Sequence, residues 1–237
     1  MKKFELTSEF ITNVLGTKLF RIKALIEFGD VSAGELGGYI EKEENLAQDG
    51  NAWVYGNAKV YGDAWVCDNA EVYGNAWVYG NAKVCGDAKV CGDAKVCGDA
   101  KVYGNAKVYG NAKVYGDAWV YGNAKVCGDA KVCGDAKVYG NAKVYGNAKV
   151  YGDAWVCGDA DYSTVKGFGR IFRTTTFFRK KDKDIGVSCG CFYGTLEEFR
   201  KKVKETHGES KTAKEYLMLA DLMEYKFSRE MDEEVNQ

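Results

Sequence analysis

The sequence predicts a mainly β fold in which a parallel β-solenoid is flanked by two smaller segments. Between Ala52 and Asp159 the six-residue word A-x-V-x-G-[ND] occurs eighteen times without insertion or deletion, with Asp68 as the one departure from Gly. Within each word apolar and outward positions alternate with a period of two, which a strand gives and a helix does not. Each word ends in Gly followed by Asn or Asp, residues that tolerate positive φ and so favour a sharp corner.

One word on its own cannot be stable. It buries one Val, worth roughly 2 kcal/mol, whereas ordering its six backbone residues costs about 1 to 2 kcal/mol each. The difference has to come from the hydrogen-bond ladder between neighbouring coils, from the alanines and from stacking of identical outward side chains. We therefore expect stacked coils whose two ends are covered by caps.

Composition narrows the functional classes. The chain has 237 residues, 46% of them apolar, and a net charge of −1, which argues against a general binder of nucleic acid or of anionic membranes. The charge is balanced in each part of the chain, and no apolar run is long enough for a signal peptide or a membrane span. Nine cysteines in a chain without an export signal are expected to be free thiols in a cytoplasmic protein. We expect no cofactor.

The repeat resembles the hexapeptide-repeat superfamily, in which a small residue stands two positions before an aliphatic one. That resemblance implies a left-handed parallel β-helix in which three words make one triangular coil, so that the eighteen words give about six coils. The stretch LFRIKALIEFGDVSAGELGGYIEKEENLAQDGNAWVYGNA, residues 19–58, resembles the opening of uncharacterised bacterial and phage-borne hexapeptide proteins labelled acyltransferases. The segment TTTFFRKK…VSCGCFYGTLEEF resembles a module that accompanies such repeats in phage and prophage proteins. One departure is that Tyr or Cys follows the valine, where the family usually has a small residue.

With three words per coil, the outward residues at one position of every third word form a vertical column, and the columns lie on three faces. The third face carries three of the five tryptophans, and on this interpretation all five point outward, Trp53 included. Tyr and Trp are favoured anchors at protein interfaces, although Lys stems and Tyr rings that simply cover the strands explain the same pattern. The third face is our predicted contact surface, either for a protein partner or for self-association as a dimer or trimer. Its residues are Trp65, Trp119, Trp155, Tyr103, Tyr121, Tyr139, Lys83, Lys101 and Lys137.

Seven cysteines alternate with tyrosine at one repeat position. Because a metal ligand or nucleophile would not exchange freely with phenol, we interpret them as small space-filling residues. Cys67 and Cys85 are predicted to lie one strand spacing apart, close enough for a disulfide in an oxidising setting. Cysteines separated by one word length do not have zinc-site spacing.

Family resemblance implies an acyl-CoA-dependent acyltransferase with a catalytic His on a coil or loop and a donor site between subunits of a trimer. The repeat contains no His, Ser or Thr, so we assign no catalytic residue, and His207, the one His of the chain, is the fallback. His207 is most simply a favourable charge in the last turn of a helix. Cys189 and Cys191 are expected on the same side of a strand, where they are weak candidates to join His207 at a metal.

The two ends are expected to differ. Residues 1–45 are predicted to form a strand-rich cap, residues 46–160 the solenoid, and residues 161–237 a β-hairpin with two helices at about 195–207 and 211–230. Thr195 with Glu198 forms a capping box. Basic and aromatic residues mix in GRIFRTTTFFRKK, a possible nucleic-acid surface built from Arg170, Arg173, Arg179, Lys180, Lys181, Phe172, Phe177 and Phe178, but a hairpin with one apolar face explains them equally well.

The sequence therefore favours a non-enzymatic β-solenoid, phage- or prophage-associated, that serves as a rigid scaffold or recognition rod. Binding would involve the outward Trp/Tyr/Lys columns or the C-terminal segment. Two alternatives stay open: an acyl-CoA-dependent acyltransferase, and a phage protein that inhibits or sequesters a host factor. We expect nucleic-acid binding and membrane association to be absent.

Overall fold

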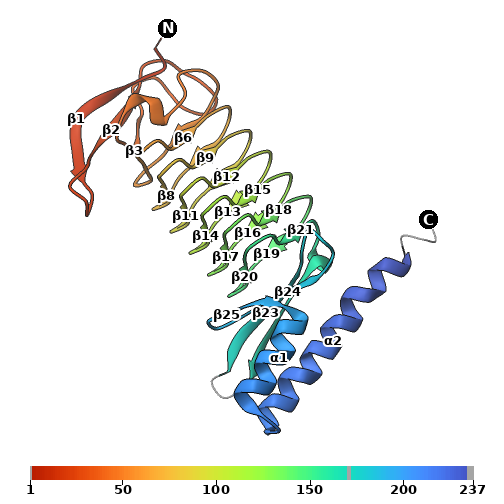
Figure 1. Cartoon of the computed structure of the whole chain (residues 1–237). Coiled ribbons are helices and arrows are strands. Elements are labelled where there is room, and N and C mark those ends of the chain that lie inside the picture. Colours follow the sequence, from red (N-terminus) through yellow and green to blue (C-terminus); the bar gives the residue numbers. More distant parts are fainter. Residues whose placement is uncertain (1, 170–171, 234–237) are drawn as a thin grey trace.

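The protein consists of three parts arranged in a row (Figure 1). The computed structural model describes residues 2–169 and 172–233, with side chains as far as residue 228. An N-terminal hairpin leans against one end of a long parallel coil, and an antiparallel sheet with two helices closes the other end. The predicted mainly β fold with a parallel solenoid is therefore confirmed.

The solenoid has three faces, each a ladder of two-residue strands in parallel register. The first face contains β4 (Trp53–Val54), β7 (Glu71–Val72), β10 (Lys89–Val90), β13 (Lys107–Val108), β16 (Lys125–Val126) and β19 (Lys143–Val144). The second contains β5 (Lys59–Val60), β8 (Trp77–Val78), β11 (Lys95–Val96), β14 (Lys113–Val114), β17 (Lys131–Val132) and β20 (Lys149–Val150). The third contains β6 (Trp65–Val66), β9 (Lys83–Val84), β12 (Lys101–Val102), β15 (Trp119–Val120), β18 (Lys137–Val138) and β21 (Trp155–Val156).

The interior of the coil is made of the repeated valines and alanines. Up to the last coil, each valine pairs with the valine three words further along the chain, as Val90 does with Val108, and all the repeat valines are fully buried. The ladder holds the coils together through bonds such as Lys95 N–H to Ala112 C=O at 2.9 Å and Cys97 N–H to Val114 C=O at 3.0 Å. Side chains at the word's second and fourth positions point outward, as the alternation predicts.

The N-terminal cap also contributes to the coil. Strands β1 (Phe4–Thr12) and β2 (Lys18–Ala24) pair antiparallel, and β2 pairs with β3 (Leu36–Ile40), which in turn lies parallel to β5. The second face therefore has seven parallel strands where the other two have six, because β3 starts an irregular coil that continues through η1 (Glu43–Asn45). The expected six coils are thus about one too few.

Trp53 has an outward position like the other tryptophans, but it is not exposed as an outward residue was expected to be. Its position in the word is an outward one, since it pairs with Glu71, yet its side chain is 0% exposed. The rings of Phe4 and Phe28 lie over it, with centroid distances of 6.2 and 5.3 Å. The residue's direction follows from the repeat, whereas its burial follows from a segment that folds back from outside the repeat.

The C-terminal part is a four-stranded antiparallel sheet where the sequence predicted a two-stranded hairpin. After η2 (Asp159–Asp161) come β22 (Tyr162–Phe168), β23 (Arg173–Arg179), β24 (Ile185–Cys189) and β25 (Phe192–Thr195), paired in that order. The predicted hairpin around KDKD is the β23–β24 pair, and β22 and β25 flank it. Neither flanking strand stands out in sequence, because β22 mixes Gly with polar residues and β25 has only four residues.

Two helices pack on this sheet, α1 (Leu196–His207) and α2 (Lys211–Glu233). The predicted capping box is confirmed: the Thr195 hydroxyl accepts from the Glu198 N–H at 3.2 Å, and the Glu198 carboxylate accepts from the Thr195 N–H at 2.8 Å. Gly208 ends α1 with φ +54°. Among the described residues, neither helix has an apolar stretch of the length that crossing a bilayer requires.

The sheet closes the open end of the coil. Phe178 on β23 and Tyr162 on β22 belong to the same buried cluster as the valine column. The Lys149 N–H donates to the Thr176 hydroxyl at 3.0 Å, and the Lys181 N–H donates to the Asp153 C=O at 3.2 Å. These contacts replace the ladder partner that the last coil lacks.

Candidate functional site

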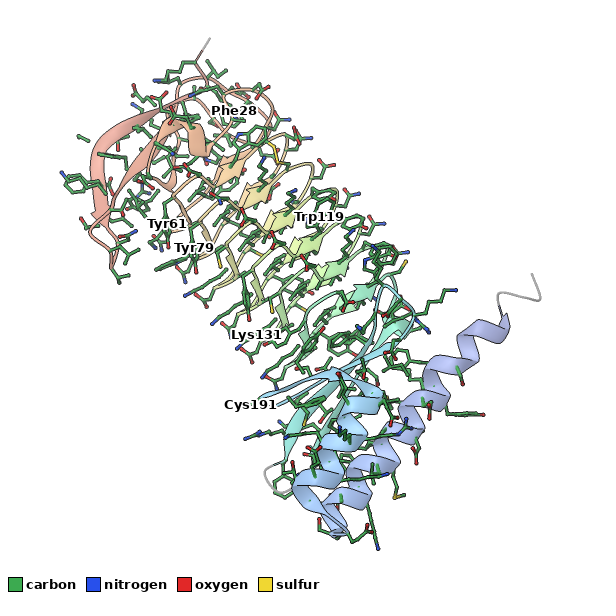
Figure 2. The ribbon with its side chains drawn as sticks, viewed as in Figure 1. Phe28, Tyr61, Tyr79, Trp119, Lys131 and Cys191 are labelled. Carbon is green, nitrogen blue, oxygen red and sulfur yellow. A yellow bond between two sulfur atoms is a disulfide. The ribbon has the colours of Figure 1, made fainter. Side chains whose placement is uncertain are left out.

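The third face places its predicted contact residues in one straight seam. Trp155, Lys137, Trp119, Lys101, Lys83 and Trp65 follow one another in direct register along the ladder. Beside them, the rings of Tyr103, Tyr121 and Tyr139 stack with centroid distances of 5.2 and 5.1 Å. The structure thus brings together all nine residues that the sequence singled out, and Trp119 marks the middle of the seam in Figure 2.

The lysine ammonium groups and tryptophan rings of this seam already contact one another. The ammonium of Lys101 lies 4.5 Å from the ring centre of Trp119, and that of Lys137 lies 5.2 Å from Trp119 and 5.3 Å from Trp155. Such cation–π contacts are worth about 0.5 to 1 kcal/mol each at exposed sites. Of the tryptophans only Trp65, at 41%, is exposed. The geometry favours a stabilising role for the seam, and its use as a contact surface stays a prediction.

The second face repeats the arrangement. Tyr61 and Tyr79 stack at 5.0 Å with their planes 3° apart, and the ammonium of Lys95 lies 4.7 Å from the ring centre of Trp77. Because the same contacts recur where the sequence predicted no special surface, they are a property of the repeat rather than of one face.

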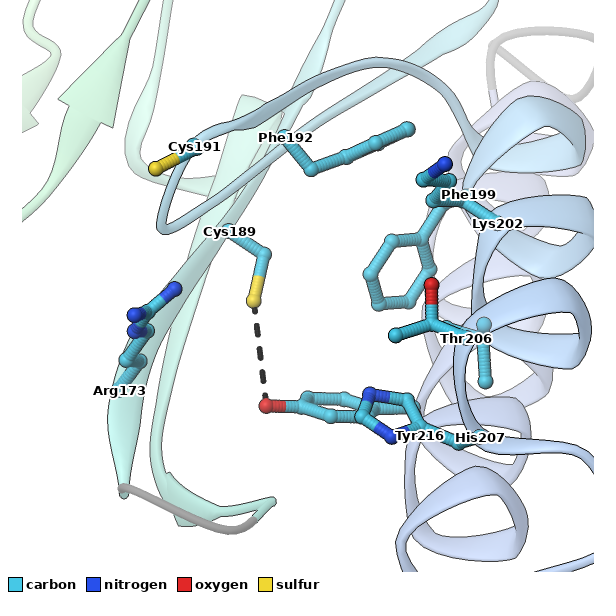
Figure 3. Close-up of a pocket in the computed structure, with 10 residues that line it drawn as sticks. Arg173, Cys189, Cys191, Phe192, Phe199, Lys202, Thr206, His207 and Tyr216 are labelled. Carbon is cyan, nitrogen blue, oxygen red and sulfur yellow. Dashed lines mark hydrogen bonds between the residues drawn. The ribbon is translucent and has the colours of Figure 1, made fainter.

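A pocket of about 400 Å³ opens between the C-terminal sheet and its helices (Figure 3). The strands contribute residues at their ends, and the helices contribute one side of α1 and the first turns of α2. Its lining residues are Arg173, Cys189, Cys191, Phe192, Phe199, Lys202, Val203, Thr206, His207 and Tyr216.

Aromatic rings form the inner wall of this pocket. Phe199 on α1 meets Phe192 at a centroid distance of 5.5 Å and Tyr216 at 5.7 Å. The apolar stripe of α1, Leu196, Phe199 and Val203, is buried, and it holds the wall in place. The pocket therefore offers an apolar interior that is set by the packing of the two helices.

Tyr216 and His207 lie together at the base of the pocket. Their rings are 6.0 Å apart, with planes 29° from parallel. The Cys189 thiol lies 4.0 Å from the Tyr216 hydroxyl, and the Thr175 hydroxyl donates to the Cys189 sulfur at 3.2 Å. Burial, together with the nearby Cys189, raises the pKa of Tyr216 to about 12, so the phenol keeps its proton at neutral pH.

The charged groups of the lining all have one sign. Arg173 and Lys202 are cationic, the imidazole of His207 lies in the same lining, and none of the ten lining residues is Asp or Glu. Lys202 has an exposed ion pair with Glu205 at 3.5 Å, which is outside the lining and is weakened by solvent. An apolar pocket with cationic groups at its rim fits a ligand that joins an anionic group to an apolar body.

Cys189, Cys191 and His207, which the sequence offers only as weak metal candidates, do not form a compact ligand set among the described residues. All three residues line the pocket, but Gly190 has φ +62° and Cys189 pairs directly with Phe192. Cys191 is therefore in a two-residue turn rather than on the strand, and the two sulfur atoms point in different directions (Figure 3). Within the described part of the chain, these three residues do not gather their ligand atoms closely enough for one ion.

The mixed basic and aromatic stretch does not form an open stacking surface. Phe177 and Phe178 are fully buried, and Phe172 is exposed. Arg179 pairs with Asp161 at 3.2 Å and Lys180 with Asp153 at 3.5 Å, while Arg170 lies outside the described residues. The hairpin explanation of these residues is the one that the geometry favours.

The repeated word, the parallel ladder and the buried valine column define a β-solenoid repeat protein of the hexapeptide type. Residues 106–122 and 142–158 match the family model described as the YdcK β-solenoid repeat. The chain is 44% identical over 62 residues to the protein named uncharacterized acetyltransferase YdcK of Escherichia coli (strain K12). That alignment covers 23% of this chain and 19% of the relative, so the matched region spans about a fifth of the relative's length. The predicted resemblance to hexapeptide-like solenoids labelled acyltransferases is confirmed.

Proposed function

We propose that this protein is a non-enzymatic scaffold whose solenoid holds the C-terminal pocket at a fixed distance from its N-terminal cap, and that the pocket recognises a protein partner. The part of the partner that enters is a carboxylate next to an apolar side chain. The observation that carries this proposal is the charge of the lining: two cations and a histidine, no acid, around an aromatic wall.

Electrostatics inside the pocket support the position of the anion. The C-terminal end of α1 lies at His207, and a helix C-terminus has partial negative charge. An anion is therefore held toward Arg173 and Lys202, while its apolar part lies against Phe192 and Phe199. Because Arg has a planar group with several donors, Arg173 is the residue we expect to contribute most.

A matched pair of small probes tests this recognition. Phenylacetate and phenylacetamide have nearly the same shape and differ in charge, and ligand-observed NMR measures the binding of each. We expect phenylacetate to bind at least about tenfold more tightly, since a charged hydrogen-bonded pair contributes about 1.5 to 3 kcal/mol. Arg173→Met should remove this preference, while Lys201→Met, on α1 outside the pocket lining, should retain it. Equal binding of the two probes would contradict the proposal.

An acetyltransferase is the second candidate, favoured by the name of the E. coli relative and by the position of His207 in the pocket. A general base usually has a partner that orients it. In the described residues the ring of His207 contacts Tyr216 and no carboxylate is hydrogen-bonded to it. Micromolar affinity for acetyl-CoA that is lost in His207→Gln would support the enzyme, and the absence of acetyl-CoA binding would count against it.

The third candidate is sequestration of a host factor, which rests on the resemblance of the flanks to phage-borne proteins. It needs a recognition site, as the scaffold proposal does. If the factor is sequestered, a pull-down from bacterial lysate should recover it with the native chain and lose it with Arg173→Met. A chain that stays monomeric and recovers nothing would argue against sequestration.

A further inference from the structure

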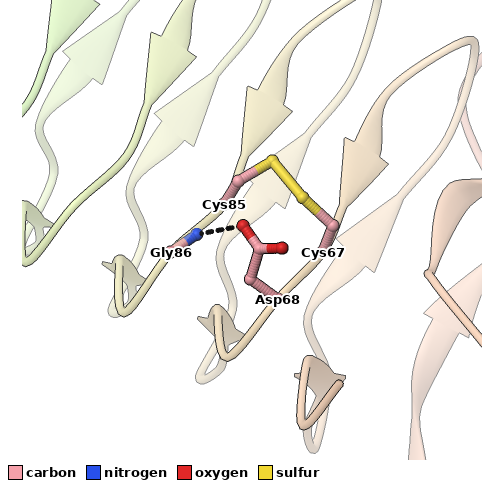
Figure 4. The surroundings of a disulfide bond; sticks show 4 residues. All are labelled: Cys67, Asp68, Cys85 and Gly86. Atoms are coloured by element: carbon pink, nitrogen blue, oxygen red, sulfur yellow. Dashed lines mark hydrogen bonds between the residues drawn. A yellow bond between two sulfur atoms is a disulfide. The ribbon is translucent and has the colours of Figure 1, made fainter. Parts of the chain in front are cut away.

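We propose that Cys67, Asp68 and Cys85 form a binding site for a soft divalent metal ion such as Zn²⁺ when the disulfide between the two cysteines is reduced. The site lies beside β6 and β9 on the third face, at the other end of the solenoid from the C-terminal helices (Figure 1), and does not depend on the proposed function. Its surroundings are drawn in Figure 4.

Two departures from the repeat coincide at this corner. Cys67 and Cys85 are the one place where cysteine stands directly above cysteine on neighbouring coils, and Asp68 is the one residue that replaces the corner glycine. The cysteines occupy adjacent rungs, with Cα atoms 4.8 Å apart. A space-filling role explains a cysteine in place of a tyrosine, but it does not explain an acid next to two of them.

The ligand atoms are close enough for one ion. The two sulfur atoms and a carboxylate oxygen of Asp68 all lie within 4.8 Å of one another. In a tetrahedral zinc site with Zn–S bonds of about 2.3 Å, the two sulfur atoms are about 3.8 Å apart. Reduction of the disulfide allows the sulfurs to separate to that distance by side-chain rotation, without movement of the coils.

Asp68 is held in a position to contribute. Its φ of +60° lies in the left-handed region, which Asp adopts more readily than most residues other than Gly, so the corner keeps its shape without the glycine. One carboxylate oxygen, Oδ2, accepts a hydrogen bond from the Gly86 N–H at 2.8 Å, as Figure 4 shows. That bond orients the carboxylate next to the sulfurs and leaves Oδ1 for the metal, in the manner of a supporting hydrogen bond to a metal ligand.

The site forms in two steps, a thiol–disulfide exchange followed by metal binding. Two equivalents of a thiol reductant convert the cystine into two thiols and are themselves oxidised to a disulfide. The metal then displaces both thiol protons, giving two thiolates and one carboxylate as ligands. Cys67 is only 4% exposed, whereas Asp68 is exposed, so the fourth position faces solvent and water can complete the tetrahedron.

Cobalt(II) provides the test, because its thiolate complexes have a charge-transfer absorption that carboxylate complexes lack. The full chain is reduced with a phosphine, freed of reductant without air, and titrated with Co²⁺. We expect one equivalent to bind with thiolate absorption, and we expect the oxidised protein to show none. Zn²⁺ should displace the Co²⁺ and remove the absorption.

The repeat itself provides matched variants, since Cys85→Tyr and Asp68→Gly restore residues that other words have at these positions. Cys85→Tyr should abolish the absorption. Asp68→Gly should weaken Co²⁺ binding by at least about tenfold, because loss of a supporting group alone costs that much. The double variant Cys189→Ser/Cys191→Ser should retain full binding. Thiolate absorption that survives in Cys85→Tyr, or its absence from the reduced native chain, would overturn the proposal.

Discussion

At the corner glycines, the backbones of neighbouring coils lie very close together. Gly98 has φ +69°, and a Cβ placed on it would lie 3.0 Å from the backbone nitrogen of Gly116 on the next coil. The backbones approach this closely because identical corners stack directly above one another. Glycine is thus required twice, once for its conformation and once for its lack of a side chain.

The two requirements can be separated by a pair of substitutions. Gly146 has φ +63° and nothing within 4 Å of a Cβ, so Gly146→Ala tests conformation alone. We expect Gly146→Ala to lower the free energy of unfolding by about 1 to 2 kcal/mol. Gly98→Ala should cost about 1 kcal/mol more, because the crowded backbone must shift. Urea denaturation followed by circular dichroism measures both, and equal losses would mean that the coils adjust freely.

At the scale of the element, the columns of Asn and Asp next to these glycines differ in how well they pair. Asn81 donates to the Asp99 carboxylate at 2.9 Å, and Asn111 donates to the Asp129 carboxylate at 3.0 Å. Below Asp99 the same column continues with Asp117, Asp135 and Asp153. Adjacent carboxylates have no proton to share at neutral pH, so this part of the column is repulsive.

Asp117→Asn should therefore stabilise the solenoid by a few tenths of a kcal/mol up to about 1 kcal/mol at low salt. The new amide can donate to a neighbouring carboxylate and removes one of the repelling charges. Asp129→Asn is the matched control, because Asp129 lies between two asparagines in its column, and it should be close to neutral. Thermal denaturation in low and high salt measures both, and the gain from Asp117→Asn should shrink as salt screens the charges. A loss of stability in Asp117→Asn would contradict this account.

At the scale of the whole molecule, the outward tyrosines link stability to alkaline pH. A hydrogen bond with Cys91, together with burial, raises the pKa of Tyr73 to about 12, and burial raises the pKa of Tyr79, Tyr103 and Tyr121 as well. The ordinary value is 10.0. A phenol whose pKa is raised in the folded state holds its proton more tightly there than in the unfolded state. The stability that this contributes is complete below pH 10 and is lost as the pH rises.

We therefore expect the melting temperature to fall steeply between pH 10 and pH 12, the window set by the value of Tyr73. Lys3 opposes this trend below that window: its burial lowers its pKa to about 8, which makes stability rise with pH from there toward 10.5. The triple variant Tyr103→Phe/Tyr121→Phe/Tyr139→Phe keeps the stacked rings and should flatten the alkaline fall. Circular dichroism melts at increasing pH measure the effect. A melting temperature that stays constant through the window would mean that the phenols titrate as they do in the unfolded chain.

The sequence alone determined the solenoid, its inward valines, its outward columns, the corner glycines and the capping box of α1. These features repeat, or depend on residues a few positions apart, so a local pattern carries them. The pairing of Cys67 with Cys85 was foreseeable for the same reason, because a coil of three words fixes which side chains stack.

Only the tertiary structure determined how the two ends of the solenoid are covered and where the C-terminal pocket forms. Trp53 has the outward position of its word and is buried by Phe4 and Phe28, which come from a segment outside the repeat. The flanking strands β22 and β25, and the pocket whose lining includes both Arg173 and His207, depend on chain segments that meet only when the sheet and helices pack together. No period connects these residues, so their meeting is set by burial of apolar surface between distant segments rather than by any pattern along the chain.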